Sequence, residues 1–529
     1  SGAGSKETDS LNSTPTTKVL GTIAINAPAG ASTATITANG VTVTPTVVKT
    51  AARNPITVSA NSIGLYVNTS GKDYTKSITG LGNLTSEADL IIGTEAAQST
   101  TSKYIQVSDN KILDPYNNAI LSSGVSKWDI YSGSLTWITT PTLDPATGKV
   151  TNLYMAKVPY TEWAADKDTY NFADGLEQRY GVEALGTREN KVFQKLNGIG
   201  NNEETLLFQA YDEMMGHQYA NVQQRINATG NILDKEFDYL RSEWQTASKS
   251  SNKVKTFGTR GEYKTDTAGI IDYKYNGYGV AYVHENEDIK LGRGIGWYTG
   301  IVQNTLKFKD IGKSKEEQLQ AKVGIFKSVP FDDNNSLNWT ISGDIFAGYN
   351  KMNRKYLVVD EIFSAKSKYY NYGVSIKNEI GKEFRLSEGF SLRPYAALDL
   401  EYGRVSKIRE KSGEIKLDVK QNDYISIKPE VGTELAYKHY FGRKTLKTAL
   451  SVAYENELGK LANGKNKAKV ANTKADWFNI RGEKEDRKGN VKFDLNVGLD
   501  NQRVGVTANV GYDTKGENIR GGVGLRVIF

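Results

Sequence analysis

The chain has 529 residues, a formal net charge of +7 and no cysteine. This composition excludes disulfides and thiol chemistry, and the lack of a basic stripe with interleaved aromatic residues argues against a nucleic-acid partner. No run of about 18 apolar residues occurs, so no transmembrane helix is expected. The first ten residues lack the charged and apolar regions of a signal peptide, and a β-type pattern is already under way, so we expect a fragment of a longer protein.

Residues 1–160 are rich in threonine, serine, alanine and asparagine, and they contain short β-type runs separated by turn residues. The runs recur at irregular intervals of roughly 10 to 25 residues, which suits the coils of a solenoid. The run 62–67 is typical of one rung of a β-helix. We therefore expect the end of a β-helix, with a β-sandwich as the alternative. Trp128, Tyr131 and Trp137 can stack a sugar or a partner, but we expect them in the core that closes this region.

Residues 161–230 favour helix formers and predict a helical linker. One predicted helix, 203–226, has apolar residues with a period near 3.6, which gives it one face for packing. These residues are Leu207, Tyr211, Met214, Val222 and Ile226.

Residues 231–252 predict a single amphipathic helix with Asn231 as a candidate N-cap and an apolar stripe that includes Leu233 and Phe237. At about 1.5 Å per residue the helix spans roughly 30 Å, the thickness of a bilayer core. Because its other faces are charged, it cannot face lipid, but it can fill a polar lumen. We therefore predict a pore-plugging helix. The residues assigned to it are Asn231, Asp234, Glu236, Phe237, Arg241 and Trp244.

Residues 253–529 form a train of segments in which apolar and charged residues alternate. Side chains alternate across a strand, so each segment has one apolar and one ionic face. Phe493 and Leu495, for example, oppose Lys492 and Asp494. In a soluble sandwich the ionic face meets water, whereas in a membrane barrel it lines the lumen. The ionic residues assigned to the lumen are Arg260, Glu262, Lys377, Glu379, Asp399, Glu401, Lys428, Glu430 and Glu434.

Three features favour the membrane barrel. Tyrosine and tryptophan cluster near strand ends, as at Trp297-Tyr298; short and long loops alternate; and the segment has room for about twelve strands. The last stretch, 517–529, would leave an open edge unless it pairs with the first strand. For the third strand, the pattern does not decide which face points outward, because apolar residues occupy both faces. The predicted strands are 254–264, 270–286, 292–309, 317–329, 337–350, 369–385, 390–408, 424–440, 446–458, 490–499, 502–513 and 518–529, with 476–486 assigned to a loop.

The helical linker, the segment MMGHQYANVQQRINATGNILDKEFDYLRSEW, the twelve-strand pattern and the terminal GGVGLRVIF resemble the C-terminal half of a type Va (classical) autotransporter. The sequence is similar to those of the large fusobacterial outer-membrane adhesins in particular, and the resemblance covers residues 181–529. It implies a terminal signal that the barrel-assembly machinery reads. The residues that fit this signal are Arg520, Gly522, Leu525, Val527 and Phe529, with valine at position 527 departing from the usual aromatic residue.

The resemblance implies a mainly β chain: a 12-stranded antiparallel transmembrane β-barrel with a lumenal α-helix, preceded by a helical linker and the end of a β-helical passenger. It implies a barrel in the bacterial outer membrane that secretes and anchors its own surface-exposed adhesin passenger. The implied partners are outer-membrane lipids, the barrel-assembly machinery, periplasmic chaperones and a host-cell or bacterial surface ligand bound by the upstream passenger. No cofactor and no nucleic acid are implied, and the barrel is expected to be monomeric.

Candidate catalytic groups are few, and we expect no enzymatic activity. Some relatives cleave their passenger at a paired asparagine in the helix, but Gln223-Gln224 stands here instead, and Asn221, Asn227 and Asn231 are better explained by capping and solvation. His217, His284 and His439 lie far apart in the sequence, which leaves no pattern for a triad or a metal site.

Two other functions remain open from the sequence. A porin or uptake channel would conduct steadily, whereas a plugged barrel would conduct little until the helix is displaced. A soluble secreted β-helical lectin or hydrolase would be monomeric in buffer without detergent.

Overall fold

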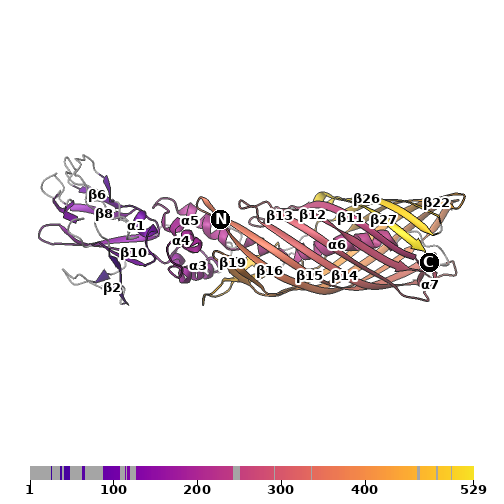
Figure 1. Cartoon of the computed structure of the whole chain (residues 1–529), viewed down its shortest axis with the longest axis horizontal. Helices are drawn as coiled ribbons and strands as arrows, with labels where there is room; N and C mark the ends of the chain where they lie inside the picture. Colours follow the sequence, from indigo (N-terminus) through magenta and orange to yellow (C-terminus); the bar gives the residue numbers. More distant parts are fainter. Residues whose placement is uncertain are drawn as a thin grey trace.

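The computed structural model describes residues 25–26, 36–38, 41–47, 62–65, 87–107, 113–114, 116–118, 127–241, 251–290, 292–334, 336–461, 465–483, 487–501 and 503–528. The molecule is elongated and has three parts in chain order: a β-rich N-terminal region, a cluster of helices and a barrel (Figure 1). The barrel end that meets the helices is called the linker end below, and the opposite end, where strand β27 finishes, is called the far end.

The described residues of the N-terminal region form three small sheets. Strands β5, β6 and β8 pair in parallel and in register, so that Ile63 lies beside Leu90 and Leu90 beside Ile130. This pairing is what stacked coils require, but it involves few residues, and the β-helix stays a prediction. The elements are β1 (Ile25–Asn26), β2 (Ile36–Ala38), β3 (Val41–Val43), β4 (Thr46–Val47), β5 (Ser62–Leu65), β6 (Glu87–Ile92), α1 (Glu95–Gln98), β7 (Tyr104–Val107), β8 (Lys127–Ser132), β9 (Trp137–Leu143) and β10 (Val150–Lys157).

The linker consists of η2 (Tyr160–Trp163), α3 (Lys167–Arg179), α4 (Arg188–Asn197), α5 (Glu204–Met214) and η3 (His217–Tyr219). The helix expected over 203–226 is interrupted, because Gly216 adopts a left-handed φ of 82°. A Cβ atom at this position would lie 2.6 Å from Leu417 Cδ1. Glycine therefore permits both the turn and the close approach of the linker to the barrel.

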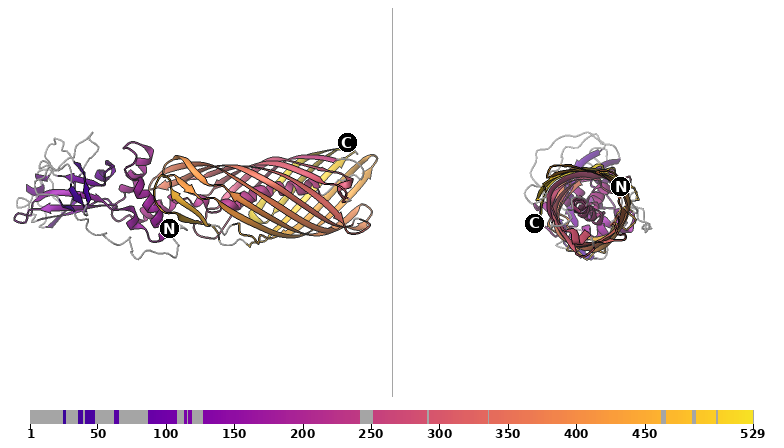
Figure 2. Two further views of the ribbon diagram at one scale, coloured as in Figure 1. Left: turned by 90° about the horizontal axis from the view of Figure 1, so that it is seen from below. Right: turned by 90° about the vertical axis from the view of Figure 1, so that its right-hand side faces the viewer.

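Twelve long antiparallel strands close into a barrel by pairing the first, β11, with the last, β27, which confirms the predicted strand number and closure. The view along the axis shows the closed ring with a helix inside it (Figure 2). The barrel strands are β11 (Ser251–Tyr263), β12 (Tyr273–Glu285), β13 (Gly296–Phe308), β14 (Lys315–Pro330), β15 (Leu337–Val358), β16 (Glu361–Lys382), β18 (Phe390–Val405), β21 (Asn422–Phe441), β22 (Lys444–Glu455), β25 (Asn490–Asp500), β26 (Val504–Asp513) and β27 (Asn518–Ile528).

The long loops carry structure of their own. The segment 476–486 was expected to be a loop but contains strand β24, which pairs with β23. The additional elements are α7 (Glu287–Lys290), β17 (Phe384–Ser387), β19 (Ile408–Gly413), β20 (Leu417–Val419), β23 (Lys465–Val470), β24 (Phe478–Arg481) and η4 (Lys515–Glu517).

The outer face of the barrel carries the apolar side chains. Ile345, Val506 and Val523 are 68%, 54% and 62% exposed, which suits contact with hydrocarbon. Trp339 and Tyr349 bracket this band on β15, whereas Tyr298, expected in an aromatic girdle, points into the lumen and is buried. Among the described helices, none is long and apolar enough to cross a membrane.

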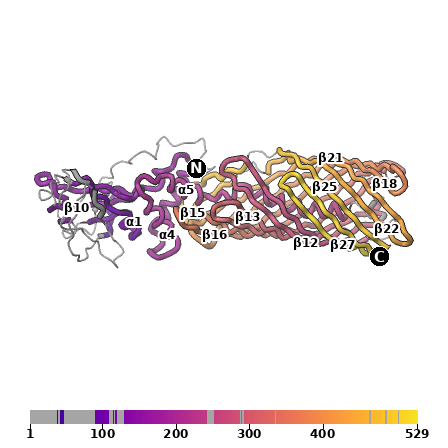
Figure 3. The backbone as a smooth tube through the Cα atoms, turned by 90° about the horizontal axis from the view of Figure 1, so that it is seen from above, coloured from indigo at the N-terminus to yellow at the C-terminus, as the bar shows by residue number. Residues whose placement is uncertain are grey.

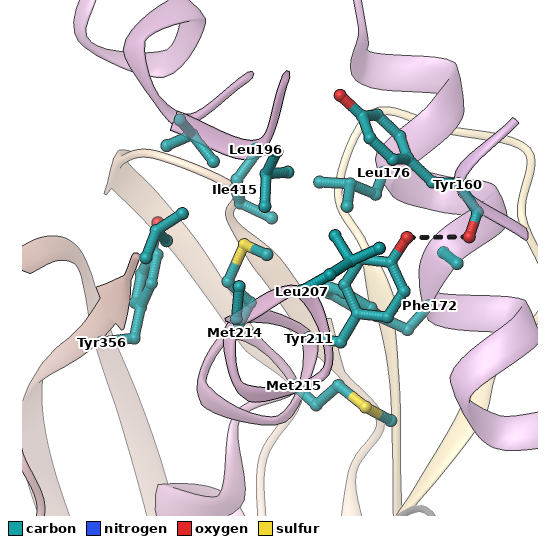
Figure 4. Packing of buried hydrophobic residues seen from close by; sticks show 14 of the residues in the cluster. Tyr160, Phe172, Leu176, Leu196, Leu207, Tyr211, Met214, Met215, Tyr356 and Ile415 are labelled. Atoms are coloured by element: carbon teal, nitrogen blue, oxygen red, sulfur yellow. Dashed lines mark hydrogen bonds between the residues drawn. The ribbon is translucent and has the colours of Figure 1, made fainter. Parts of the chain in front are cut away.

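The largest hydrophobic core of the described residues runs from the N-terminal β region through the linker to the end of the barrel. Tyr356 and Ile415 of the barrel side approach Met214 and Leu207 of α5 (Figure 4). Figure 3 shows α4 and α5 beside the ends of β15 and β16. The linker therefore docks onto one end of the barrel through packed side chains.

Candidate functional site: the barrel lumen and its helix

The helix α6 (Val222–Arg241) runs inside the barrel (Figure 2). It begins nine residues before the expected start at Asn231, so Asn231 lies within the helix and is not its N-cap. Residues 222–226 already belong to the helix predicted over 203–226. The prediction divides the two helices at 227–230, where α6 is continuous, whereas the break lies at Gly216. Trp244 lies outside the described residues.

The apolar stripe of α6 packs against one side of the barrel wall. Leu233 and Phe237 contact strands β12 to β14, and the rings of Phe237 and Tyr298 lie 4.6 Å apart. A Cβ atom at Gly300 would lie 2.9 Å from Leu233 Cδ2, so this glycine makes room for the helix. The apolar wall explains why the third predicted strand was ambiguous: Val302 and Leu306 of β13 are buried in the lumen.

Charged residues of α6 pair with the wall along the length of the helix. Nearest the linker end, Arg225 Nε donates to Glu316 Oε1 at 2.9 Å, and the Tyr369 hydroxyl also donates to Glu316. Arg225 and Glu316 are 2% and 0% exposed. A buried ion pair of this kind holds position well, because separating the two charges leaves each without compensation.

The middle of the helix is held by a second network. Lys322 Nζ of β14 lies 3.0 Å from Asp234 and 3.6 Å from Glu401 of β18. Asn227 donates from Nδ2 to Glu401 Oε2 at 2.6 Å, and Tyr424 donates to the same oxygen at 2.8 Å. One wall carboxylate thus links the helix to two further strands.

Towards the far end, Lys235 pairs with Asp513 and Glu236 pairs with Lys255, each at 2.5 Å. Arg520 of β27 lies 2.6 Å from Asp513 and 2.5 Å from Asp494. The last strand is therefore joined to the helix through a shared carboxylate.

Asp238 also joins the helix to the wall. It pairs with Arg241 at 2.8 Å and with Lys377 of β16 at 3.2 Å. On the wall, Glu379 pairs with Arg393 at 2.8 Å, and Glu430 pairs with Lys492 at 2.5 Å.

Cavities remain on the side of α6 away from its apolar stripe. One of about 440 Å³ is lined by Gln224, Asn231 and Lys428, among others. Another of about 290 Å³ lies towards the far end and includes Arg241 and Glu434. A small cavity of about 30 Å³ between them is lined by charged residues including Asp399, with room for only a few water molecules. The space beside the helix is thus divided into cavities whose linings include charged residues.

Seven of the nine residues assigned to the lumen lie on its inner face, and two do not. Arg260 is exposed on the outer face of β11, opposite Ile519. Glu262 follows two residues later on the same face, paired with Lys264 at 2.8 Å, although its side chain also borders the cavity of about 440 Å³. The alternation itself corrects the assignment, because Lys255 and Phe257 on the other face are the buried ones. Charged side chains are tolerated outward here because the strand has passed the apolar band.

The residues of the terminal signal divide between the two faces of β27. Arg520 and Gly522 face the lumen, where a Cβ at Gly522 would lie 3.0 Å from Lys255 Cε. Leu525 is 41% exposed on the outer face, and Val527 lies on the same face. Phe529 lies outside the described residues.

Sequence reasoning missed several residues that hold the helix. Glu316, Lys322, Lys255 and Asp513 all contact α6 or its partners. A signal was present in β14, where Glu316, Gln318, Gln320 and Lys322 form an unbroken polar row at every second position.

The histidines show no shared site. His217 lies in the linker, where Nε2 is 2.8 Å from Asp212, and His284 and His439 lie on barrel strands. Within the part of the chain that the structure describes, no group of acidic or histidine side chains is arranged to hold a metal ion.

Comparison with known proteins gives a family. The family model of the autotransporter beta-domain matches residues 253–511. No curated protein sequence matches the chain. The solved structures that are similar to it include three autotransporter domains.

The translocator domain of the autotransporter NalP from Neisseria meningitidis has 12% identity and a TM-score of 0.42, with 58% of this chain and 96% of that chain covered. The beta domain of the Bordetella autotransporter BrkA has 12% identity and a TM-score of 0.36, with 53% and 100% covered. The transport unit of the autotransporter AIDA-I from Escherichia coli has 11% identity and a TM-score of 0.35, with 57% and 98% covered.

The family match spans the first eleven strands of the barrel and ends within β26. These strands belong to a closed barrel with an apolar exterior, and the helix that precedes its first strand occupies the lumen. The barrel therefore belongs to the autotransporter beta-domains of the type Va class: it is an outer-membrane translocator domain that supports secretion of a passenger displayed at the cell surface.

Proposed function

We propose that this barrel keeps its passenger attached after secretion and that the passenger acts as an adhesin for host-cell or bacterial surfaces. The observation that carries the proposal is the docked linker, which connects the N-terminal β region to the barrel through packed side chains and continues into the lumen as α6. A passenger attached in this way stays on the surface of its own cell, which an adhesin requires.

The docking of the linker supports retention. Arg354 of β15 donates two hydrogen bonds to Glu410, at 2.8 and 2.9 Å, and a third to the carbonyl of Met214 at 3.1 Å. Tyr219 of the linker donates to Glu410 at 2.9 Å. Arg354 and Glu410 are fully buried. Breaking such a network leaves buried charges unpaired, which costs about 3–5 kcal/mol.

The asparagines of the linker and helix fit a structural role, and we propose that the chain is not an enzyme. Asn227 holds α6 to Glu401, and Asn221 Oδ1 accepts from the backbone of Glu483 at 3.3 Å. Each side chain thus has a wall or loop partner that explains its presence.

The N-terminal region supports a β-helical passenger. Its parallel strands β5, β6 and β8 stack in register, and Trp128 and Trp137 are 3% and 1% exposed. These two side chains are core residues, whereas Tyr131 is 52% exposed. The surface ligand would bind elsewhere in the passenger.

Cell fractionation tests the proposal. Cells that express the full-length protein are separated from medium, and the passenger is detected in both fractions alongside the attachment of the cells to a second bacterial or host cell. We expect the passenger to remain with the cells and attachment to depend on it. Passenger found mainly in the medium would contradict retention, and attachment equal to that of cells without the protein would contradict the adhesin role.

Conductance separates this proposal from a porin. Deletion of residues 222–241 should change a barrel with low current into one with high single-channel current in a planar bilayer. A matched deletion of the same length within 25–107 serves as the control. High current with the helix in place would favour an uptake channel.

A further inference from the structure

Lysines gather on the outer surface of the barrel just beyond the tyrosines at the linker end of the lipid-facing band. On β15 the outward side chains Ile345 and Tyr349 are followed by Lys351, and on β16 Lys368 precedes Tyr370. The rings of Tyr349 and Tyr370 are 5.3 Å apart. Since tyrosine favours the level of lipid head groups, these lysines lie at or just outside that level.

The strand register places the lysines side by side. Lys307 of β13 lies directly opposite Lys274 of β12 on one side and Lys315 of β14 on the other. Lys351 lies directly opposite Lys368. Together with Lys366, which is opposite Asn353, they form one basic patch. The basic patch consists of Lys274, Lys307, Lys315, Lys351, Lys366 and Lys368.

The protein neutralises little of this charge. Lys315 lies 3.4 Å from Glu317, and Glu317 is also directly opposite Lys351 in the strand register. The other five lysines are exposed and form no ion pair with a carboxylate of the described residues. Like charges directly opposite one another destabilise a sheet. An anion seated between them would remove that repulsion.

We propose that the basic patch binds the phosphate groups of a lipid in the outer leaflet, a glycolipid with a phosphorylated head group. Lysine is a compact cation that binds phosphate as a point charge, and its long apolar stem can lie along the barrel wall while the ammonium group reaches the head group. The tyrosines beneath the patch would contact the glycerol or sugar level of the same lipid. The patch would thus fix the depth of the barrel on this side.

The test compares lipids that differ only in phosphate. The purified full chain in detergent is titrated with diphosphorylated lipid A and with its dephosphorylated form, and binding is read by native mass spectrometry. Each lysine near a membrane surface contributes roughly a fivefold gain in affinity for anionic lipid. The triple variant Lys307→Ser, Lys351→Ser, Lys368→Ser should therefore bind the phosphorylated form on the order of 100-fold more weakly.

A matched variant controls for total charge. Lys327→Ser, Lys382→Ser, Lys444→Ser removes three exposed outward lysines at the far end of the barrel, and it should bind as the parent chain does. Heat-modifiable migration in gels shows that both variants have folded barrels. Equal binding of the two lipid forms, equal losses in the two variants, or a competing effect of inorganic phosphate as strong as that of the lipid would each overturn the proposal.

Discussion

Arg225 of the lumenal helix and Glu316 of strand β14 form an ion pair 2.9 Å apart in which neither side chain is more than 2% exposed. The next residue of the strand, Glu317, points outward and is 44% exposed. Two adjacent glutamates thus occupy opposite environments, because side chains alternate across a strand. The contrast makes it possible to separate the effect of charge in the lumen from that of charge in general.

Glu316→Gln should loosen the helix. The substitution keeps the size of the side chain but leaves Arg225 as a buried charge without its partner, which costs about 3–5 kcal/mol. We expect the barrel to unfold at a lower temperature in detergent, and we expect faster proteolysis within α6. Thermal migration assays and limited proteolysis measure both.

Glu317→Gln is the matched control and should change stability by less than about 0.5 kcal/mol, since an exposed ion pair contributes little. In the double variant Arg225→Met, Glu316→Gln the buried charge is gone, and part of the loss should return. Equal effects of the two single glutamine variants would mean that the lumenal pair does not hold the helix.

Gly300→Val should push the helix away from its wall. The added Cβ would meet Leu233 at 2.9 Å and Phe237 at 3.0 Å, and overpacking of this kind costs about 1–3 kcal/mol. Because the contact is between wall and helix, we expect single-channel current to rise as well as stability to fall.

Gly343→Val is a control on the neighbouring part of the sheet, where a Cβ would have its nearest neighbour at 3.5 Å and would point outward. Unchanged current in both variants would show that the packing of Leu233 and Phe237 does not close the lumen.

Alternation of polarity was enough to predict most of the barrel. On β18 and β25, charged and apolar residues separate cleanly onto two faces, and the structure puts Glu401 and Lys492 inside and Leu398 and Val497 outside. The physical reason is that one face of each strand meets hydrocarbon and the other meets an ionic lumen. The polarity of a side chain therefore predicts whether it points outward or inward.

The polarity of a side chain does not predict its direction where the two faces of the wall have similar surroundings. The wall opposite the apolar stripe of α6 is itself apolar, so Val302 of β13 is inside although its polarity suggests the outside. Beyond the apolar band the outer face meets water, so Arg260 is outside although it is charged. The extent of the helix was mispredicted for a different reason. The predicted helix 203–226 already included its first turn, but the break was placed at 227–230 and not at Gly216, whose left-handed turn lies against Leu417 of a distant strand.

Val506→Arg should disturb membrane insertion. Val506 is 54% exposed on the outer face of β26, within the apolar band, and arginine near the bilayer midplane costs about 2–4 kcal/mol. We expect less folded barrel in the membrane fraction and a lower denaturant midpoint when the protein refolds into lipid vesicles.

Ile519→Arg controls for depth. Ile519 also faces outward, but it lies opposite Arg260 and Tyr512, at the level where the apolar band ends. An arginine there should cost only about 0–1 kcal/mol. If Val506→Arg inserts as well as Ile519→Arg does, the outer face does not contact hydrocarbon as described.

Lys157 lies where the N-terminal β region joins the linker, and it should make the stability of this junction depend on pH in the alkaline range. Its Nζ is buried, pairs with Glu177 and lies 3.5 Å from the ring centroid of Tyr160. Burial lowers the pKa of Lys157 from 10.5 to about 8, although Glu177 opposes the shift. Between these two values the unfolded chain binds a proton that the folded chain has released. The junction should therefore gain stability as pH rises from about 8, by at most about 1.4 kcal/mol per unit, and lose that gain as pH falls.

Hydrogen exchange of the full chain between pH 7 and 9.5, corrected for the intrinsic rate, measures this slope as an opening free energy of residues 150–180. The range stops below pH 10, because burial raises the pKa of Tyr160 and Tyr211 and their contribution reverses the slope above that value. Lys157→Met should remove the slope. Lys103→Met should keep it, since Lys103 pairs with the same Glu177 at 3.1 Å but is 45% exposed. A slope that survives in Lys157→Met, or one that vanishes in Lys103→Met, would show that the buried ammonium group is not its source.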